Sequence, residues 1–352
     1  MSKIQLLFKL LLLLSLFSSE IYGQDKLSEN FQTSTDSSFI IIPIEIDGRN
    51  YNVLFDTGSR FNLIYDDGSG SYNFKKARKV KGLDSYNNQV EVSIIKKKIK
   101  IPSLNINMKS VVAIMKEKDR PEIMKKFNID GVLGADIINN YDWEIDYHNL
   151  KITRLTTNFN FLADSLYMIK THIDKQTHQL STNISINNDT IPFIFDTGMN
   201  SILTYNIAKQ NLQNEKVILK SFAYEYTIAG KDVDTSHIGI KDIFIGNIKV
   251  ENIPILYPKR EIMHNAIGSK FLKVFGKIYI LNSIQKILLP TIESYQYRFK
   301  NIKEENGIIV SQRVPFESKI PSYLGKKIDE IQGLNKMEYK IPQTKYSFKS
   351  KK

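Results

Sequence analysis

The tripeptide Asp-Thr-Gly occurs twice in this sequence, at residues 56–58 and again about 140 residues later, at 196–198. General acid–base catalysis by side chains needs one group that takes a proton and another that donates one. Two carboxyl groups can supply both roles if the fold brings Asp56 and Asp196 together. Otherwise both motifs are ordinary turns in which glycine supplies a left-handed conformation.

Each motif follows an apolar β-hairpin in the sequence. The stretch "SSFIIIPIEIDGRNYNVLFDTG" consists of two apolar strands around a polar turn at residues 47–50. The stretch "STNISINNDTIPFIFDTG" repeats this arrangement, with its turn at residues 187–189. Asp-Gly and Asn-rich turns between apolar runs are typical of hairpins, so the pattern predicts that each aspartate stands at the end of a second hairpin strand.

Both halves also close on the same pattern. Two apolar residues precede a glycine, in Val132-Leu133-Gly134 and in Ala266-Ile267-Gly268, and a short amphipathic helix and two strands are expected to follow. The interval from the aspartate to this glycine is 78 residues in the first half and 72 in the second. The sequence therefore predicts an internal repeat of one β-rich unit of roughly 120 residues.

Each unit resembles the clan of pepsin-like and retropepsin-like aspartic proteases, over roughly residues 39–293. The matching residues are Leu54-Phe55-Asp56-Thr57-Gly58, Ile194-Phe195-Asp196-Thr197-Gly198, Gly134 and Gly268. The detail of residues 131–152 is closer to the short retropepsin-like units of bacteria than to the longer lobes of pepsin. The resemblance implies an all-β fold with a few short helices, in which two similar barrel-type lobes hold the active site between them.

The resemblance also assigns the chemistry. Asp56 and Asp196 would be the catalytic residues, meeting across a pseudo-two-fold axis. As is known for this enzyme class, two carboxylates about 3 Å apart cannot both ionise, so they share one proton. Because the chain carries both lobes, it should act as a monomer on an extended peptide or protein substrate, without a cofactor or metal.

The neighbouring residues acquire supporting roles from the same resemblance. The hydroxyls of Thr57 and Thr197 would interlock across the two loops, with Ser59 beside them. Gly58 and Gly198 lack a Cβ, which lets the backbone come close to the opposite carboxylate. Gly134 and Gly268 would be structural, packed beneath the loops.

A substrate-covering flap is expected as well. The candidate is the hairpin of residues 80–92, which contains Gly82 and Tyr86, and residues 224–234 would be its equivalent in the other lobe.

Two residues beside the motifs depart from the family pattern. The position after the motif usually holds Ser, Thr or Ala, but here it is Ser59 in the first lobe and Met199 in the second. A hydroxyl at this place is expected to hold an outer carboxylate oxygen in its charged form, which a thioether cannot do. The hypothesis is a less acidic dyad with an optimum at mildly acidic or neutral pH. Arg60 is expected to point to solvent.

Composition excludes several other classes of protein. The chain has 352 residues, 42% of them apolar, which is enough for more than one folded unit. With no cysteine, it has no disulfide scaffold, Cys-based zinc site or thiol nucleophile. The formal charge of +12 comes from scattered lysines rather than from one periodic basic face, so nucleic-acid binding is not expected. The isolated histidines, such as His172 and His178, do not indicate a metal site.

The expected organisation follows from these patterns. Residues 1–23 have the layout of a cleaved secretory signal, and residues 24–38 are expected to be a disordered leader. The lobes would span residues 39–156 and 165–293. Residues 299–352 resemble a shortened PDZ domain with a basic tail, a small α/β appendage; a strand-and-helix cap on the second lobe is the alternative. The signal predicts export to the periplasm, the envelope or the medium, and no stable membrane span is expected.

Two functional classes remain open on the sequence. The chain is either an aspartic endopeptidase or a catalytically inactive bilobal protein that uses the same cleft to bind a peptide or another ligand. Retention of both Asp-Thr-Gly motifs favours the enzyme, because an inactive descendant has no chemical reason to keep both. A surface-binding module without a functional cleft has only the basic tail in its favour.

Overall fold

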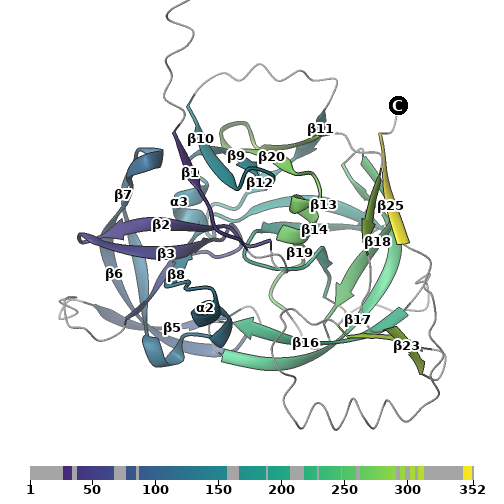
Figure 1. Ribbon diagram of the computed structural model, residues 1–352, viewed down its shortest axis with the longest axis horizontal. Helices are drawn as coiled ribbons and strands as arrows, with labels where there is room; N and C mark the ends of the chain where they lie inside the picture. Colours follow the sequence, from purple (N-terminus) through teal and green to yellow (C-terminus); the bar gives the residue numbers. More distant parts are fainter. Residues whose placement is uncertain are drawn as a thin grey trace, which may run out of the picture.

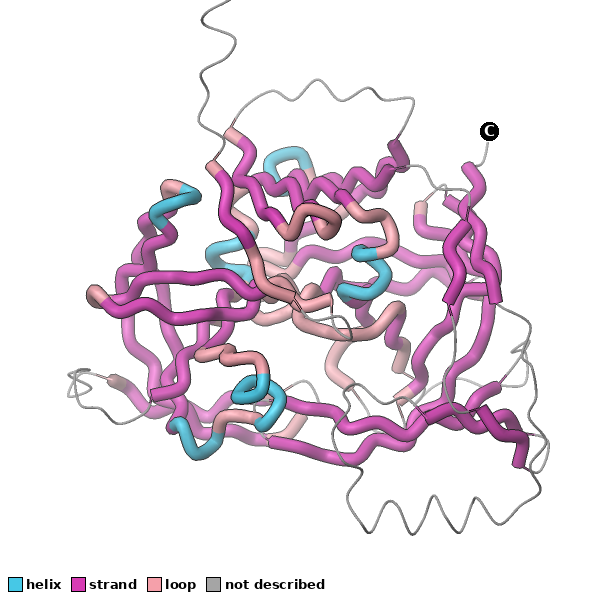
Figure 2. The backbone as a smooth tube through the Cα atoms, viewed as in Figure 1, coloured by secondary structure: helices cyan, strands magenta, loops and turns pink. Residues whose placement is uncertain are grey.

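A computed structural model gives the fold, and the residues it describes are 27–33, 38–66, 77–84, 87–156, 166–187, 189–206, 218–227, 230–246, 248–258, 262–290, 294–297, 302–305, 308–312 and 344–350. These residues form mostly strands (Figure 2). The α-helices among them are short: α2 (Glu122–Lys126), α3 (Ala135–Ile138) and α4 (Ser269–Lys273). The predicted all-β class is confirmed.

The first lobe is a closed barrel of six strands. In the order of pairing they are β2 (Ile41–Ile46), β3 (Arg49–Phe55), β8 (Gly131–Leu133), β4 (Asn62–Asp66), β7 (Ile106–Lys116) and β6 (Gln89–Ile101). The barrel closes because β6 also pairs with β2. A seventh strand, β5 (Arg78–Leu83), continues the sheet beyond β6.

The second lobe repeats this barrel strand for strand. Its members, in the same order, are β13 (Leu180–Ile186), β14 (Asp189–Asp196), β19 (Ala266–Gly268), β15 (Leu203–Thr204), β18 (Ile248–Tyr257) and β17 (Gly230–Ile245). Closure comes from pairing of β17 with β13. The strand β16 (Ile218–Thr227) extends this sheet as β5 extends the first. The internal repeat predicted from the sequence is therefore a repeat of one barrel.

A six-stranded sheet joins the two barrels, at the top of the view in Figure 1. Its order is β1 (Ser28–Asn30), β10 (Lys151–Leu155), β9 (Asp142–Asp146), β20 (Lys277–Leu281), β21 (Lys286–Pro290) and β11 (Leu166–Lys170). The central pair, β9 and β20, comes from different lobes. One hydrophobic cluster runs through both barrels and this sheet, so the lobes are held together by core packing.

The expected disordered leader is wrong for its described part. Ser28 to Asn30 form β1, which pairs antiparallel with β10. Phe31 follows with only 3% of its surface exposed, and its ring lies 5.8 Å from that of Tyr147. Burial of the Phe31 ring stabilises the docked segment even though its neighbours are polar. This short segment is therefore part of the folded protein. The predicted signal, residues 1–23, lies outside the described residues.

Local sequence explains why Asp56 directly follows the second strand of a hairpin. Between β2 and β3, Asp47 and Gly48 adopt φ angles of 51° and 81°, as the tight primed turns of hairpins require. The second strand then ends in an apolar pair that is buried in the barrel. Trp143 from β9 packs edge-on against Phe55 at 5.2 Å, which anchors the end of β3 next to Asp56.

The C-terminal residues that are described add strands to the second lobe. These are β22 (Ser294–Tyr297), β23 (Ile302–Glu305), β24 (Ile308–Gln312) and β25 (Thr344–Ser350). β24 pairs with β16, and β25 pairs with β18. The helix and the turn of the expected PDZ-like segment fall in residues 313–343, outside the described part, so this resemblance stays a prediction. Among the described residues no helix is long and apolar enough to span a membrane.

Candidate active site

Asp56 and Asp196 occupy equivalent places in the two barrels. Asp56 directly follows β3, and its N–H donates to the carbonyl of Leu133 on β8 at 3.0 Å. Asp196 ends β14, where it lies beside Gly268 of β19 in the parallel register. β3 runs parallel to β8, and β14 runs parallel to β19. The loops that follow β3 and β14 therefore leave the two barrels in the same way.

The fold brings these two residues together. A Cβ built on Gly58 would lie 2.3 Å from Cγ of Asp196, and one built on Gly198 would lie 2.3 Å from Oδ2 of Asp56. The backbone of each loop therefore touches the carboxyl group of the other, an approach that only glycine allows. Both aspartates are partly accessible to solvent, so the pair is open to a small reactant.

The threonines of the two motifs interlock beneath the carboxyl groups. The N–H of Thr57 donates to Oγ1 of Thr197 at 3.1 Å, and the reverse bond has the same length. The hydroxyl of Thr57 donates to the carbonyl of Phe195 at 2.6 Å, and that of Thr197 donates to Phe55 at 2.5 Å. Both threonines are fully buried. This reciprocal clasp fixes the position of one loop relative to the other.

Gly134 and Gly268 lie directly behind the loops. A Cβ on Gly134 would stand 2.5 Å from the carbonyl oxygen of Phe61, and one on Gly268 would stand 2.3 Å from that of Ser201. The residues after these glycines continue the support: the N–H of Ala135 donates to the carbonyl of Ser59 at 2.8 Å. The second lobe has the matching bond from Ser269 to Met199, at 2.9 Å.

The environments of the two carboxyl groups differ. Burial raises the pKa of Asp56, while hydrogen bonds from the N–H groups of Ser59 and Gly58, both 2.9 Å long, act to lower it. The pKa of Asp196 is held well above its usual range by burial and then by the charge of Asp56 and their shared hydrogen bond. The arrangement favours an ionised Asp56 that accepts a hydrogen bond from a protonated Asp196.

The expected role of the Ser59 hydroxyl is wrong. Its Oγ donates to the carbonyl of Phe61 at 2.8 Å, and Asp56 is held instead by the backbone N–H of Ser59. Met199 can supply the same backbone contact to Asp196, and its sulfur accepts from Thr204 at 3.2 Å. The difference between the two side chains is therefore not what distinguishes the carboxyl groups. Arg60 is exposed, as expected, with its guanidinium 4.8 Å from the centre of the Phe61 ring.

Asn62 is a supporting residue that sequence reasoning missed. It is 1% exposed, and its Oδ1 accepts the N–H of Gly134 at 3.0 Å. Its Nδ2 lies 3.1 Å from the carbonyl oxygen of Val111 and 2.9 Å from Oδ1 of Asp136. The asparagine thus ties β4, β7 and the start of α3 together behind the first loop. Its place six residues after Asp56 was the available signal, but a single polar residue before an apolar run is also common at the start of ordinary strands.

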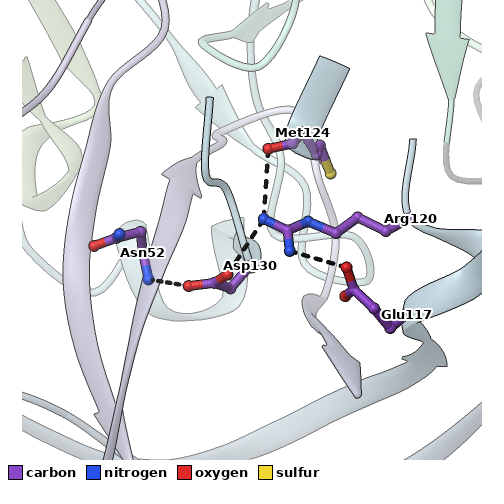
Figure 3. A network of polar contacts seen from close by, with 5 residues as sticks. All are labelled: Asn52, Glu117, Arg120, Met124 and Asp130. Atoms are coloured by element: carbon purple, nitrogen blue, oxygen red, sulfur yellow. Dashed lines mark hydrogen bonds and ion pairs between the residues drawn. The ribbon is translucent and has the colours of Figure 1, made fainter. Parts of the chain in front are cut away.

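A second polar network fixes the connection from β7 to β8 (Figure 3). The guanidinium of Arg120 contacts Glu117 at 3.1 Å, Asp130 at 3.3 Å and the carbonyl of Met124 at 3.5 Å. Asp130 in turn accepts the N–H of Asn52 on β3 at 2.8 Å. Since Asp130 directly precedes β8, this network sets where β8 begins beside the strand that carries Asp56.

Both expected flap regions are antiparallel hairpins. In the first lobe Gly82 of β5 pairs with Val90 of β6, and in the second Thr227 of β16 pairs with Gly230 of β17. In Figure 1 β5 and β16 lie near the bottom, β3 and β14 lie in the middle, and the six-stranded sheet lies near the top. Asp84 holds the first tip by accepting the N–H of Asn88 at 2.8 Å. Tyr86 is outside the described residues, so its role stays a prediction.

No group of three or more histidine, cysteine or acidic side chains within the described residues is placed to hold a metal ion.

A family model described as an aspartyl protease matches residues 182–271, the stretch from β13 to α4 that contains Asp196, Gly198 and Gly268. A search of the curated proteins gave no match. The second lobe thus carries the sequence pattern of an aspartyl protease domain, and the first lobe has the same strands and the same loop.

Proposed function

We propose that this protein is an aspartic endopeptidase that hydrolyses peptide bonds with Asp56 and Asp196. The observation that carries the proposal is the contact of each motif's glycine with the other motif's aspartate, which makes one site from two halves of the chain. The family match in the second lobe supports the same activity. Because one chain contributes both aspartates, we propose that it acts as a monomer.

The unequal environments of the two carboxyl groups suggest their roles. The Asp56 carboxylate takes a proton from a water molecule, and the resulting hydroxide adds to the scissile carbonyl carbon while Asp196 donates its proton to the carbonyl oxygen. In the second step the tetrahedral intermediate breaks its C–N bond, the proton held by Asp56 passes to the leaving amine, and a hydroxyl proton returns to Asp196. Each aspartate ends in its starting state.

The substrate proposed is an extended peptide lying between the dyad and the two hairpins. β5, and the end of β16 beyond its pairing with β24 (residues 223–227), offer backbone groups to which an extended chain can be added as a strand. We further propose that the protein acts after export, on the evidence of the signal-like pattern in residues 1–23.

The test of this function is cleavage of a random peptide library by the purified protein, with products identified by mass spectrometry. We expect cleavage by the unmodified chain and none above background by Asp56→Asn or Asp196→Asn, since either change removes one of the two proton-transferring groups. Both variants should fold, because Asn has the same shape as Asp. Equal activity in all three proteins, or no activity in any, would contradict the proposal.

The pH dependence of the reaction follows from the two pKa directions. Activity requires Asp56 without its proton and Asp196 with it. The raised pKa of Asp56 moves the acid limb of the profile up, and the still higher pKa of Asp196 extends the alkaline limb. We therefore expect kcat/KM to be highest at mildly acidic to neutral pH, measured on a peptide taken from the library. A maximum near pH 2 would contradict the raised pKa of both carboxyl groups.

A further inference from the structure

The segment that enters each barrel crosses to the loop of the opposite lobe. Residues 38–40 lead into β2, and residues 174–179 lead into β13. The two hairpins have the same register, since Ile41 pairs with Leu54 and Ser181 with Ile194, each two residues before its aspartate. Position 179 in the second lobe is therefore equivalent to position 39 in the first.

The side chain of Gln179 reaches the loop that carries Asp56. It is 7% exposed, and its Nε2 donates to the carbonyl of Gly58 at 2.5 Å. That carbonyl belongs to the same peptide unit as the N–H of Ser59, which donates to Oδ1 of Asp56 at 2.9 Å. The amide, the peptide unit and the carboxylate thus form a chain of hydrogen bonds pointing one way. Bonds arranged in series polarise one another, so each strengthens the next.

Gln179 is held in place by a tight turn. The N–H of Asp174 donates to the carbonyl of Gln179 at 3.0 Å. The carboxylate of Asp174 accepts the N–H groups of Gln176 at 2.8 Å and Thr177 at 2.7 Å. On the other side of the turn, β12 (His172–Ile173) pairs with the start of β13. The amide therefore contacts Gly58 from a fixed backbone.

The entry segment of the first lobe makes a different contact. Ser38 is fully buried, and its hydroxyl donates to Oδ1 of Asn200 at 3.1 Å and lies 2.8 Å from the hydroxyl of Ser269. Phe39, at the position equivalent to Gln179, has no hydrogen-bond donor in its side chain and packs against Phe127 at 6.5 Å. The crossing is reciprocal, but its chemistry differs between the lobes.

We propose that Gln179 is a positioning residue that selects Asp56 as the carboxylate and leaves the shared proton on Asp196. This inference rests on the proposed function. The titratable group that faces Asp56 is Asp196. Burial raises the pKa of Asp56, and the other contacts on it are the N–H groups of Ser59, Gly58 and Gly198. Of the nearby charged residues, His178 acts on Asp136, and Arg60 is exposed to solvent. Besides the N–H of Gly198, the side chain of Gln179 is thus a contact from the second lobe that favours the ionised Asp56, and it acts through the peptide unit between Gly58 and Ser59.

The test compares pH profiles of kcat/KM. Gln179→Met keeps the length of the side chain and removes the donor, so the ionised form of Asp56 loses support. We expect the acid limb to move up by about half a pH unit and the alkaline limb to stay in place. Gln179→Glu, which adds a negative charge, should move the acid limb further in the same direction.

The matched control is Asn282→Leu. Asn282 is also a buried amide that donates across the lobes, to the carbonyl of Tyr141 at 2.7 Å, but in the six-stranded sheet rather than at the dyad. Its loss should lower thermal stability without moving either limb. Equal shifts in Asn282→Leu and Gln179→Met would overturn the inference, because looser packing between the lobes would then explain both.

A second readout needs no substrate. The aspartate carboxyl groups can be titrated by ¹³C NMR, with Asp56→Asn used to assign the signal of Asp56. An upward shift of the Asp56 titration in folded Gln179→Met supports the inference, and an unchanged titration overturns it. If the shift occurs but the unmodified protein cleaves no peptide, the proposed function fails and the selection of Asp56 as the carboxylate stands.

Discussion

Gly198→Ala is expected to lower kcat/KM by at least about 100-fold, because misplacing a reacting group by about 1 Å has an effect of this size. The new Cβ would lie 2.3 Å from Oδ2 and 2.4 Å from Cγ of Asp56, closer than real Cβ atoms approach other atoms. Asp56 cannot retreat without breaking its bonds to the N–H groups of Gly58 and Ser59. The measurement is kcat/KM on a library-derived peptide.

Gly58→Ala is the reciprocal change, since its Cβ would meet the carboxyl of Asp196 at 2.3 Å. The control for folding is Gly82→Ala, because a Cβ there would meet nothing within 4 Å. Its thermal midpoint should equal that of the unmodified protein. Full activity in Gly198→Ala would mean that Gly198 does not lie against the carboxyl group of Asp56.

Thr57→Val is expected to lower the free energy of unfolding by about 2–4 kcal/mol, since the loss of one buried hydroxyl leaves two buried partners short of a bond. Those partners are the N–H of Thr197 and the carbonyl of Phe195. Valine has nearly the same shape, so the change removes hydrogen bonds with little change in packing. Activity should fall as well, because the clasp sets the distance between the aspartates. Urea unfolding and kcat measure the two effects.

The double variant Thr57→Val/Thr197→Val tests whether the clasp works as a unit. Each hydroxyl accepts the N–H of the other residue, so the combined loss of stability should differ from the sum of the single losses. The control is Thr182→Val, which removes a buried hydroxyl that donates to Lys170 within one lobe at 2.8 Å. It should destabilise by about 1 kcal/mol and leave activity intact. Additive losses would argue against a clasp.

Much of the fold could be predicted because short stretches of the sequence determine where its strands and turns lie. Apolar strands around Asp-Gly or Asn-rich turns predicted both hairpins, and the apolar pairs before Gly134 and Gly268 predicted the strands beside them. The prediction of a disordered leader was wrong because β1 forms by pairing with β10, a strand more than a hundred residues away in the sequence. A short polar segment carries no signal of such a partner.

The interlock of Thr57 with Thr197 and the close approach of the two motif glycines to the opposite aspartates were expected from the resemblance, but other contacts around the aspartates were not. Ser59 was expected to hold Asp56 by its hydroxyl, and the structure uses its backbone N–H instead, a group that every residue except proline has. Asn62 and Gln179 were missed for a related reason. A single amide side chain has no spacing pattern, and its role depends on which backbone groups it contacts in the folded protein.

The sequence by itself determined that the chain has two copies of one β-rich unit, each with one aspartate at the end of a hairpin. Repeated motifs and the alternation of apolar and polar residues are patterns along the chain, so they can be recognised in one amino-acid sequence. Only the tertiary structure decided how the surroundings of the two aspartates differ, since the N–H groups, the neighbouring carboxyl and the burial that raise or lower each pKa meet at one point. Those groups come from both lobes, and packing of the lobes against each other brings them together.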